Sequence, residues 1–261
     1  MWINRRFFGW SLAIGLVATP FVAPVPVYSA ELKAIEQRGK LIVAVKDNLH
    51  PLGFRDAAGN LQGLEIDIAK RLAEELLGKP NALILQPVNN VDRLNVVLDD
   101  KVDLTIARVT RTTSRLRVVD FSRPYYMDGT GIVTKNSAIA KLSDLATGRI
   151  AVLNGSSTIP VVKYALPNAK LVGVKSYEEA RLLLEQSGAS AFAADNSVLA
   201  GWVQDYPHYR MLPVRLAGEG LCIVMPKGVQ YAPLRQKVNE ALARWQASGW
   251  LAQRIAAWGL P

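Results

Sequence analysis

Apolar and polar positions alternate along the chain in a way that predicts strands and helices in turn. Leu41–Val45 is a short apolar run with β-branched residues at its centre, as in a buried strand. After Gly63, the residues Ile68, Leu72 and Leu76 recur every four positions, which predicts the apolar face of a helix. This alternation of element types favours an α/β fold. Further strands are expected at residues 82–85, 102–107, 150–153, 191–193 and 223–225.

The first thirty residues have a different pattern. Arg5 and Arg6 form a basic start, and residues 7–30 carry no charge. Prolines interrupt this stretch, and its clean apolar run, residues 10–19, has the length of a signal-peptide core. We therefore expect residues 1–30 to act as a cleaved signal peptide that directs the protein to the periplasm. An uncleaved anchor is the alternative, and the export route stays open between the general and the twin-arginine pathways.

Composition and charge exclude several classes of function. The net charge is +9, which suits nucleic acid, a membrane surface or an anionic ligand. However, the sequence contains no block of five consecutive basic residues, and its aromatic residues are not interleaved with its arginines, so nucleic-acid binding is not expected. Cys222 is the only cysteine, and His50 and His208 are the only histidines. No internal disulfide, metal site or cofactor is predicted from these residues.

Four short motifs follow one another in a fixed order. They are GLEID at residues 63–67, VDL at 102–104, TRTTSR at 110–115 and VDFSRPYY at 119–126. In this order they resemble the bacterial extracellular solute-binding proteins of family 3, which bind polar amino acids. The resemblance extends from residue 41 to residue 258.

The resemblance implies a two-lobed, periplasmic-binding-protein-like fold of type II. Two α/β lobes would be joined by two crossing strands that act as a hinge, with the ligand between them. Lobe 1 would contain residues 31–126 plus 223–261, and lobe 2 residues 127–222, with crossings at 125–131 and 217–222. The protein is expected to be a monomer.

The resemblance also assigns a binding site for the α-carboxylate of an amino acid. Arg115 would hold it, since a guanidinium offers two parallel donors to a carboxylate. Thr110 would support the same group. A turn with Ser156, Ser157 and Thr158 would add backbone N–H groups at the start of a helix. From spacing alone, a solvated arginine is the favoured interpretation of Arg115, and a simple helix cap is the alternative for the turn.

The remaining predicted ligand contacts concern the α-ammonium and the side chain. Asp195 would pair with the ammonium, with the N-cap of the following helix as its alternative role. Lys46 and Arg108 would bring two positive charges to the far end of the ligand, which favours glutamate or aspartate over glutamine. Against this, Asp47 adjoins Lys46, and either cation could point to solvent. Asn90 stands where relatives place an aromatic residue against the ligand.

These features predict an extracytoplasmic solute-binding protein that captures a polar, preferentially acidic, amino acid. It would deliver this ligand to the permease of an ABC transporter with its ATPase. An enzyme is not expected, because no G-x-S-x-G nucleophile elbow occurs and histidines are scarce. The family resemblance nevertheless extends to periplasmic cyclohexadienyl dehydratases and to sensory receptor domains. A dehydratase would need a general acid, for which Asp47 and Asp195 are the candidate carboxylates.

Overall fold

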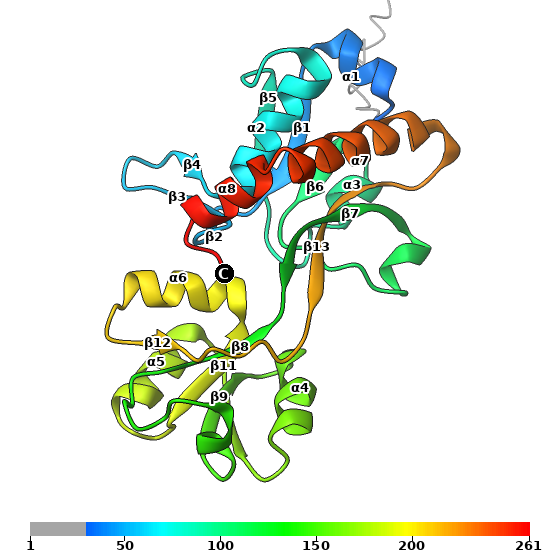
Figure 1. Ribbon diagram of the computed structural model, residues 1–261. Helices are drawn as coiled ribbons and strands as arrows, with labels where there is room; N and C mark the ends of the chain where they lie inside the picture. Colours follow the sequence, from blue (N-terminus) through cyan, green and yellow to red (C-terminus); the bar gives the residue numbers. More distant parts are fainter. Residues whose placement is uncertain (1–29) are drawn as a thin grey trace, which may run out of the picture.

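The computed structural model describes residues 30–261, which form two α/β lobes (Figure 1). The predicted signal peptide, residues 1–30, lies outside the described residues except for Ala30. Each lobe is built on a five-stranded sheet, and a small three-stranded sheet extends from lobe 1. The predicted two-lobed α/β fold is confirmed.

The sheet of lobe 1 has the strand order β5-β1-β6-β13-β7. β1 pairs in parallel with β5 and β6, and β13 pairs antiparallel with β6 and β7. Every residue of β1 is buried, as its continuous apolar run predicts. The bounds are β1 Leu41–Val45, β5 Leu83–Pro87, β6 Leu104–Ile106, β7 Val119–Asp128 and β13 Glu219–Pro226; the small sheet contains β2 Asn48–Leu49, β3 Gly53–Arg55 and β4 Leu61–Gln62.

Helices cover this sheet and complete the lobe 1 core. Ile68 and Leu72 of α2 are fully buried, in one cluster with Leu242 and Trp245 of α7. The predicted apolar face of α2 is therefore the face that packs inward. The helix α3 is a single turn. The bounds are α1 Leu32–Arg38, α2 Leu64–Leu77, α3 Asn95–Leu98, α7 Ala232–Ala247 and α8 Trp250–Ala257, with 3₁₀ helices at Arg115–Arg117 and Val229–Tyr231.

Lobe 2 has the strand order β10-β9-β11-β8-β12. A capping box at the start of α5 is half formed, since Ser176 Oγ accepts a 3.1 Å hydrogen bond from the Glu179 N–H. The Glu179 carboxylate bonds instead to the N–H of Lys175, at 2.7 Å. The bounds are β8 Thr130–Thr134, β9 Arg149–Leu153, β10 Lys170–Val174, β11 Ala191–Asp195, β12 Arg210–Met211, α4 Thr158–Ala165, α5 Tyr177–Glu185 and α6 Asn196–Asp205, with a 3₁₀ helix at Leu142–Leu145.

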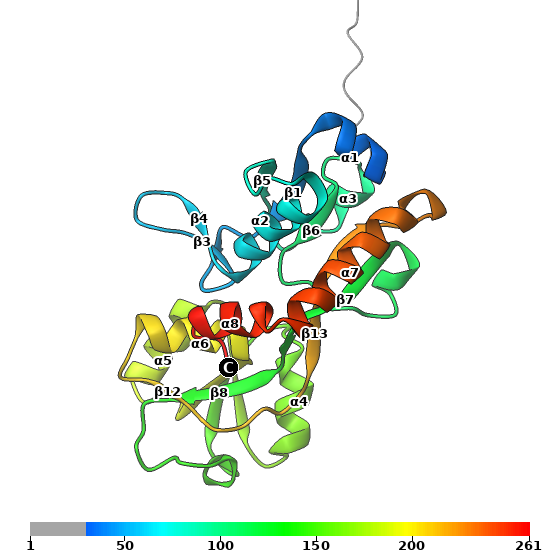
Figure 2. The same ribbon diagram turned by 45° about the horizontal axis from the view of Figure 1, so that its top comes forward.

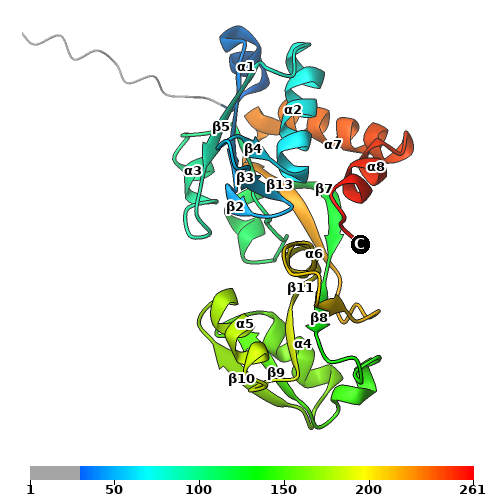
Figure 3. The same cartoon turned by 90° about the vertical axis from the view of Figure 1, so that its left-hand side faces the viewer.

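The chain passes between the lobes twice, and the two passages lie side by side. β7 and β13 run together from the lobe 1 sheet toward lobe 2, where Asp128 pairs with Glu219 (Figures 1 and 3). Gly129 follows directly, and a side chain at this position would collide with the carbonyl oxygen of Ala217 in the other passage. Glycine therefore allows the close approach of the two strands. The predicted lobe boundaries, after residues 126 and 222, fall inside β7 and β13, and this division stays a prediction.

Candidate functional site

A cavity of about 360 Å³ opens between the lobes, beside the two passages of the chain. Lobe 1 contributes Arg93, Arg108, Thr110 and Arg115, whereas lobe 2 contributes Ser156, Ser157, Tyr177 and Asp195, and β13 adds Glu219. Six of the ten residues predicted for the site thus line one cavity: Arg108, Thr110, Arg115, Ser156, Ser157 and Asp195.

Arg115 and Thr110 form a fixed pair on the lobe 1 side. Nη1 of Arg115 donates to the carbonyl oxygen of Thr110 at 2.8 Å and to its hydroxyl at 2.9 Å. Thr110 is itself held by a β-bridge to Leu221 in β13. These bonds orient the guanidinium in the cavity wall, which suits it to receive a carboxylate.

The turn of lobe 2 faces this pair from the start of α4. Ser156 and Ser157 line the cavity, and Ser156 Oγ accepts a 3.1 Å hydrogen bond from the N–H of Thr158. The Thr158 side chain is buried, does not line the cavity, and its N–H is engaged within the turn. The geometry therefore offers Ser156 and Ser157, rather than Thr158, to a bound anion.

Asp195 occupies the N-cap position of α6, but its side chain makes no capping hydrogen bond. Its Oδ2 instead pairs with Nη2 of Arg108, across the cavity from the other lobe. Nε of Arg108 lies 3.9 Å from Oδ2 of Asp128, a buried carboxylate that accepts hydrogen bonds from Gly129 and Ser197. Arg108 therefore points into the cleft, and its guanidinium lies between two carboxylates.

The backbone of Arg108 is also fixed. Its φ of 49° places it in the left-handed region, which is uncommon for a residue with a side chain. Its N–H donates to Oε1 of Glu65 at 2.6 Å, and its carbonyl oxygen accepts a 2.6 Å bond from Nη1 of Arg93. Both hydrogen bonds hold an otherwise unfavourable conformation in place.

Sequence reasoning missed Glu65, which was visible only as the acidic position of the GLEID motif. Glu65 is fully buried, and its Oε1 accepts hydrogen bonds from the Tyr125 hydroxyl at 2.5 Å and from the N–H of Arg108. Burial raises the pKa of the Glu65 carboxyl, although these hydrogen bonds oppose the shift. Glu65 thereby connects a cleft arginine to a tyrosine of β7, one of the strands that joins the lobes.

Arg93 and Glu219 were also missed, since neither belongs to a motif that the sequence displays. Burial, with the neighbouring Arg115 and Arg108, lowers the pKa of Arg93 to about 10. The lowered pKa of Arg93 reflects first its burial and then the nearby guanidinium groups. Among the described residues, three arginines and two carboxylates line the cavity, which leaves an excess of positive charge.

Lys46, Asp47 and Asn90 do not line this cavity. Lys46 is buried, its Nζ donates to the Val88 carbonyl oxygen at 2.9 Å, and burial lowers its pKa. Asp47 accepts a 3.3 Å bond from Arg55, and Asn90 is exposed. The second cation expected from Lys46 is instead supplied by Arg93, because the lysine is used to satisfy a backbone carbonyl of lobe 1.

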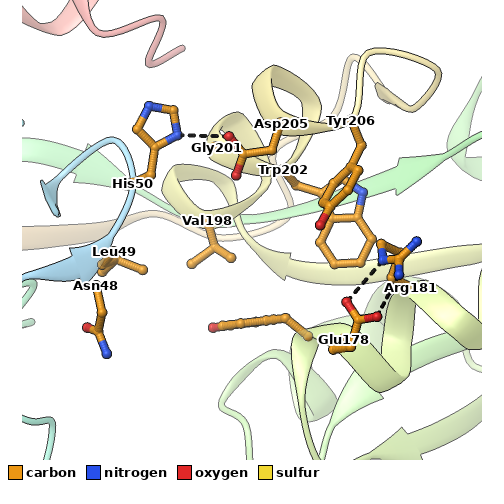
Figure 4. Close-up of a pocket in the computed structure, with 11 residues that line it drawn as sticks. Asn48, Leu49, His50, Glu178, Arg181, Val198, Gly201, Trp202, Asp205 and Tyr206 are labelled. Atoms are coloured by element: carbon orange, nitrogen blue, oxygen red, sulfur yellow. Dashed lines mark hydrogen bonds and ion pairs between the residues drawn. The ribbon is translucent and has the colours of Figure 1, made fainter. Parts of the chain in front are cut away.

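A second cavity of about 240 Å³ is lined by residues of both lobes (Figure 4). Tyr177 lines this cavity and the first one. Here His50 of lobe 1 faces Asp205 at the end of α6, with 3.5 Å between Nδ1 and Oδ1. Gly201 of α6 lies against the His50 carbonyl oxygen, where no side chain would fit. Figures 2 and 3 show α6 at the edge of lobe 2 that faces lobe 1, close to α8. These contacts join the lobes beside the cleft.

Metal sites and membrane-spanning helices were sought among residues 30–261. No group of three or more histidine, cysteine, aspartate or glutamate residues between 30 and 261 could hold a metal ion. No helix in the same range is long and apolar enough to cross a membrane.

Residues 41–261 match the family of bacterial extracellular solute-binding proteins, family 3. A glutamine-binding protein of Geobacillus stearothermophilus is 34% identical over 184 residues, which are 69% of this chain and 70% of that protein. A cyclohexadienyl dehydratase of Pseudomonas aeruginosa is 26% identical and covers 94% of this chain and 92% of its own. The solved structure of an ancestral cationic amino acid solute-binding protein superposes with a TM-score of 0.75 at 27% identity, covering 87% of this chain and 99% of that one.

Proposed function

Because this chain belongs to the bacterial extracellular solute-binding proteins of family 3, we propose that it captures an acidic amino acid and delivers it to an ABC uptake transporter. Delivery would pass the ligand to the permease, which works with its ATPase. The family is extracellular by its description, which supports a periplasmic location for the mature chain. We further propose that it acts as a monomer, which size-exclusion chromatography with light scattering tests.

The excess of guanidinium groups in the cleft supports the preference for an acidic ligand. Arg93, Arg108 and Arg115 line the cavity against Asp195 and Glu219. A cation in a partly desolvated site is costly unless an anion neutralises it. A neutral or basic amino acid leaves the positive charge uncompensated, whereas glutamate or aspartate supplies one further carboxylate.

The cavity wall suggests how such a ligand is oriented. The α-carboxylate would bind Arg115 together with Thr110 and the turn at Ser156 and Ser157. The side-chain carboxylate would then face Arg93, beside the Arg108–Asp195 ion pair. Closure of the lobes around the ligand would engage both groups at once, and a ligand that binds both lobes shifts the protein toward its closed state.

A thermal-shift screen of the twenty amino acids tests this proposal. Glutamate and aspartate should raise the melting temperature most, with glutamine next. Arg93→Met should lower the shift from glutamate more than the shift from glutamine, because only glutamate loses a charge partner. Arg111→Met is the matched control, since Arg111 is exposed and outside this cavity. A larger shift with arginine, histidine or leucine would contradict the acidic preference.

We also propose that the ligand leaves the cleft chemically unchanged. The dehydratase relative keeps an enzymatic alternative open, and dehydration needs a protonated acid beside the leaving hydroxyl. Glu65, whose pKa burial raises, does not line the cavity, and Asp195 is paired with Arg108. Incubation with a cyclohexadienyl compound followed by NMR checks this, and catalytic loss of water would contradict it.

A further inference from the structure

The cleft carboxylate Asp195 is already neutralised by the protein itself. Its Oδ2 is bonded to Nη2 of Arg108, and the two side chains are exposed by only 21% and 20%. An α-ammonium that binds Asp195 would therefore have to displace or share a guanidinium. Such an exchange replaces one cation by another and brings little net interaction.

Arg108 is held in this place by two backbone hydrogen bonds and by the ion pair of its guanidinium with Asp195. The N–H is bonded to Glu65, the carbonyl oxygen to Arg93, and the guanidinium lies between Asp195 and Asp128. A long arginine on a surface loop has many conformations, but these contacts select one of them. The Arg108–Asp195 ion pair is thus a structural feature of the cleft.

The carbonyl oxygen of Arg108 is occupied in the same way, since Nη1 of Arg93 bonds to it at 2.6 Å. The Asp195 carboxylate and the Arg108 carbonyl oxygen would otherwise be acceptors for an ammonium. They are instead paired with Arg108 and Arg93. Arg93 and Arg115 remain in the wall as donors for anions. The cleft is therefore better suited to bind carboxylates than to bind an amino group.

We infer that the cleft binds small dicarboxylates that carry no amino group, such as 2-oxoglutarate and glutarate, as well as acidic amino acids. This inference rests on the proposed function, because it uses the same two carboxylate positions. The α-amino group of glutamate then contributes little to affinity. Glu219 is the other carboxylate in the cavity wall, so it is the alternative to Asp195 as a binding partner for an ammonium.

Calorimetric titration of the mature protein with glutamate, 2-oxoglutarate and glutarate tests the inference. The three affinities should agree within about 10-fold, whereas an ammonium held by a free, desolvated carboxylate would make the difference about 30-fold or more. Arg108→Met removes the partner of Asp195. The ratio of the affinity for glutamate to the affinity for 2-oxoglutarate should therefore rise about 30-fold relative to the wild type. Arg111→Met, in the same loop but exposed, should leave the ratio unchanged.

The outcomes separate the inference from the proposed function. If glutamate binds and both amine-free ligands are weaker by about 30-fold or more, the inference is wrong and the acidic preference stands. If Glu219→Gln then removes that preference for glutamate, the ammonium binds Glu219, which also overturns the inference. If none of the three ligands binds but another amino acid does, the proposed function itself fails.

Discussion

Replacing Arg115 by alanine removes the guanidinium that we expect to hold the α-carboxylate. In the structure its Nη1 is bonded to Thr110, at 2.8 Å and 2.9 Å, and its side chain lies in the cavity wall. Loss of one partner from a desolvated charge pair costs about 2–5 kcal/mol. Because Arg115 is half-buried, we expect the lower part of that range, or about 30- to 150-fold in the dissociation constant.

Stability should change much less than binding. Thr110, the partner of Arg115, keeps its β-bridge to Leu221, so the loop remains attached to β13. A substitution of a half-exposed side chain of this kind changes the unfolding free energy by about 0.5 kcal/mol. Calorimetry gives the affinity and urea denaturation the stability. Arg117→Ala, an exposed arginine of the same 3₁₀ helix, is the control. Near-normal ligand binding by folded Arg115→Ala would remove this residue from the site.

Three further predictions concern charge and processing. Glu65 holds its proton more tightly in the folded state, so stability of the wild type should fall, relative to Glu65→Gln, as pH rises above the ordinary value of 4.5; parallel denaturation profiles of the two proteins would contradict this. Asp195→Asn should change the affinities for glutamate and glutarate by the same factor, and a selective loss of glutamate in calorimetry would show that the ammonium needs Asp195. N-terminal sequencing of the exported protein should begin at Ala30 or Glu31, and an intact Met1 in the membrane fraction would exclude cleavage.

Local sequence patterns predicted the elements well because their causes are local. The four-residue spacing in α2 and the buried run of β1 each depend on neighbouring residues, and both predictions agree with the structure. The family resemblance also predicted that Arg115, Thr110 and Asp195 share one site, and all three line one cavity.

The missed and misplaced residues depend on distant contacts. Glu65 reads locally as an acidic residue in the first turn of a helix, yet its partners Arg108 and Tyr125 are 43 and 60 residues away. Lys46 directly follows β1, and its position along the chain does not reveal that Nζ turns toward Val88, 42 residues on. Whether a side chain turns into the cleft or behind it is decided by such partners.

Competition calorimetry on the mature protein tests the acidic-ligand cleft most directly. The protein is loaded with glutamate, and arginine, leucine, glutamine and aspartate are titrated against it in turn. Aspartate should displace glutamate, glutamine should do so only at higher concentration, and arginine and leucine should leave it bound. Displacement of glutamate by arginine or leucine at lower concentration than by aspartate would contradict a cleft selected for negative charge.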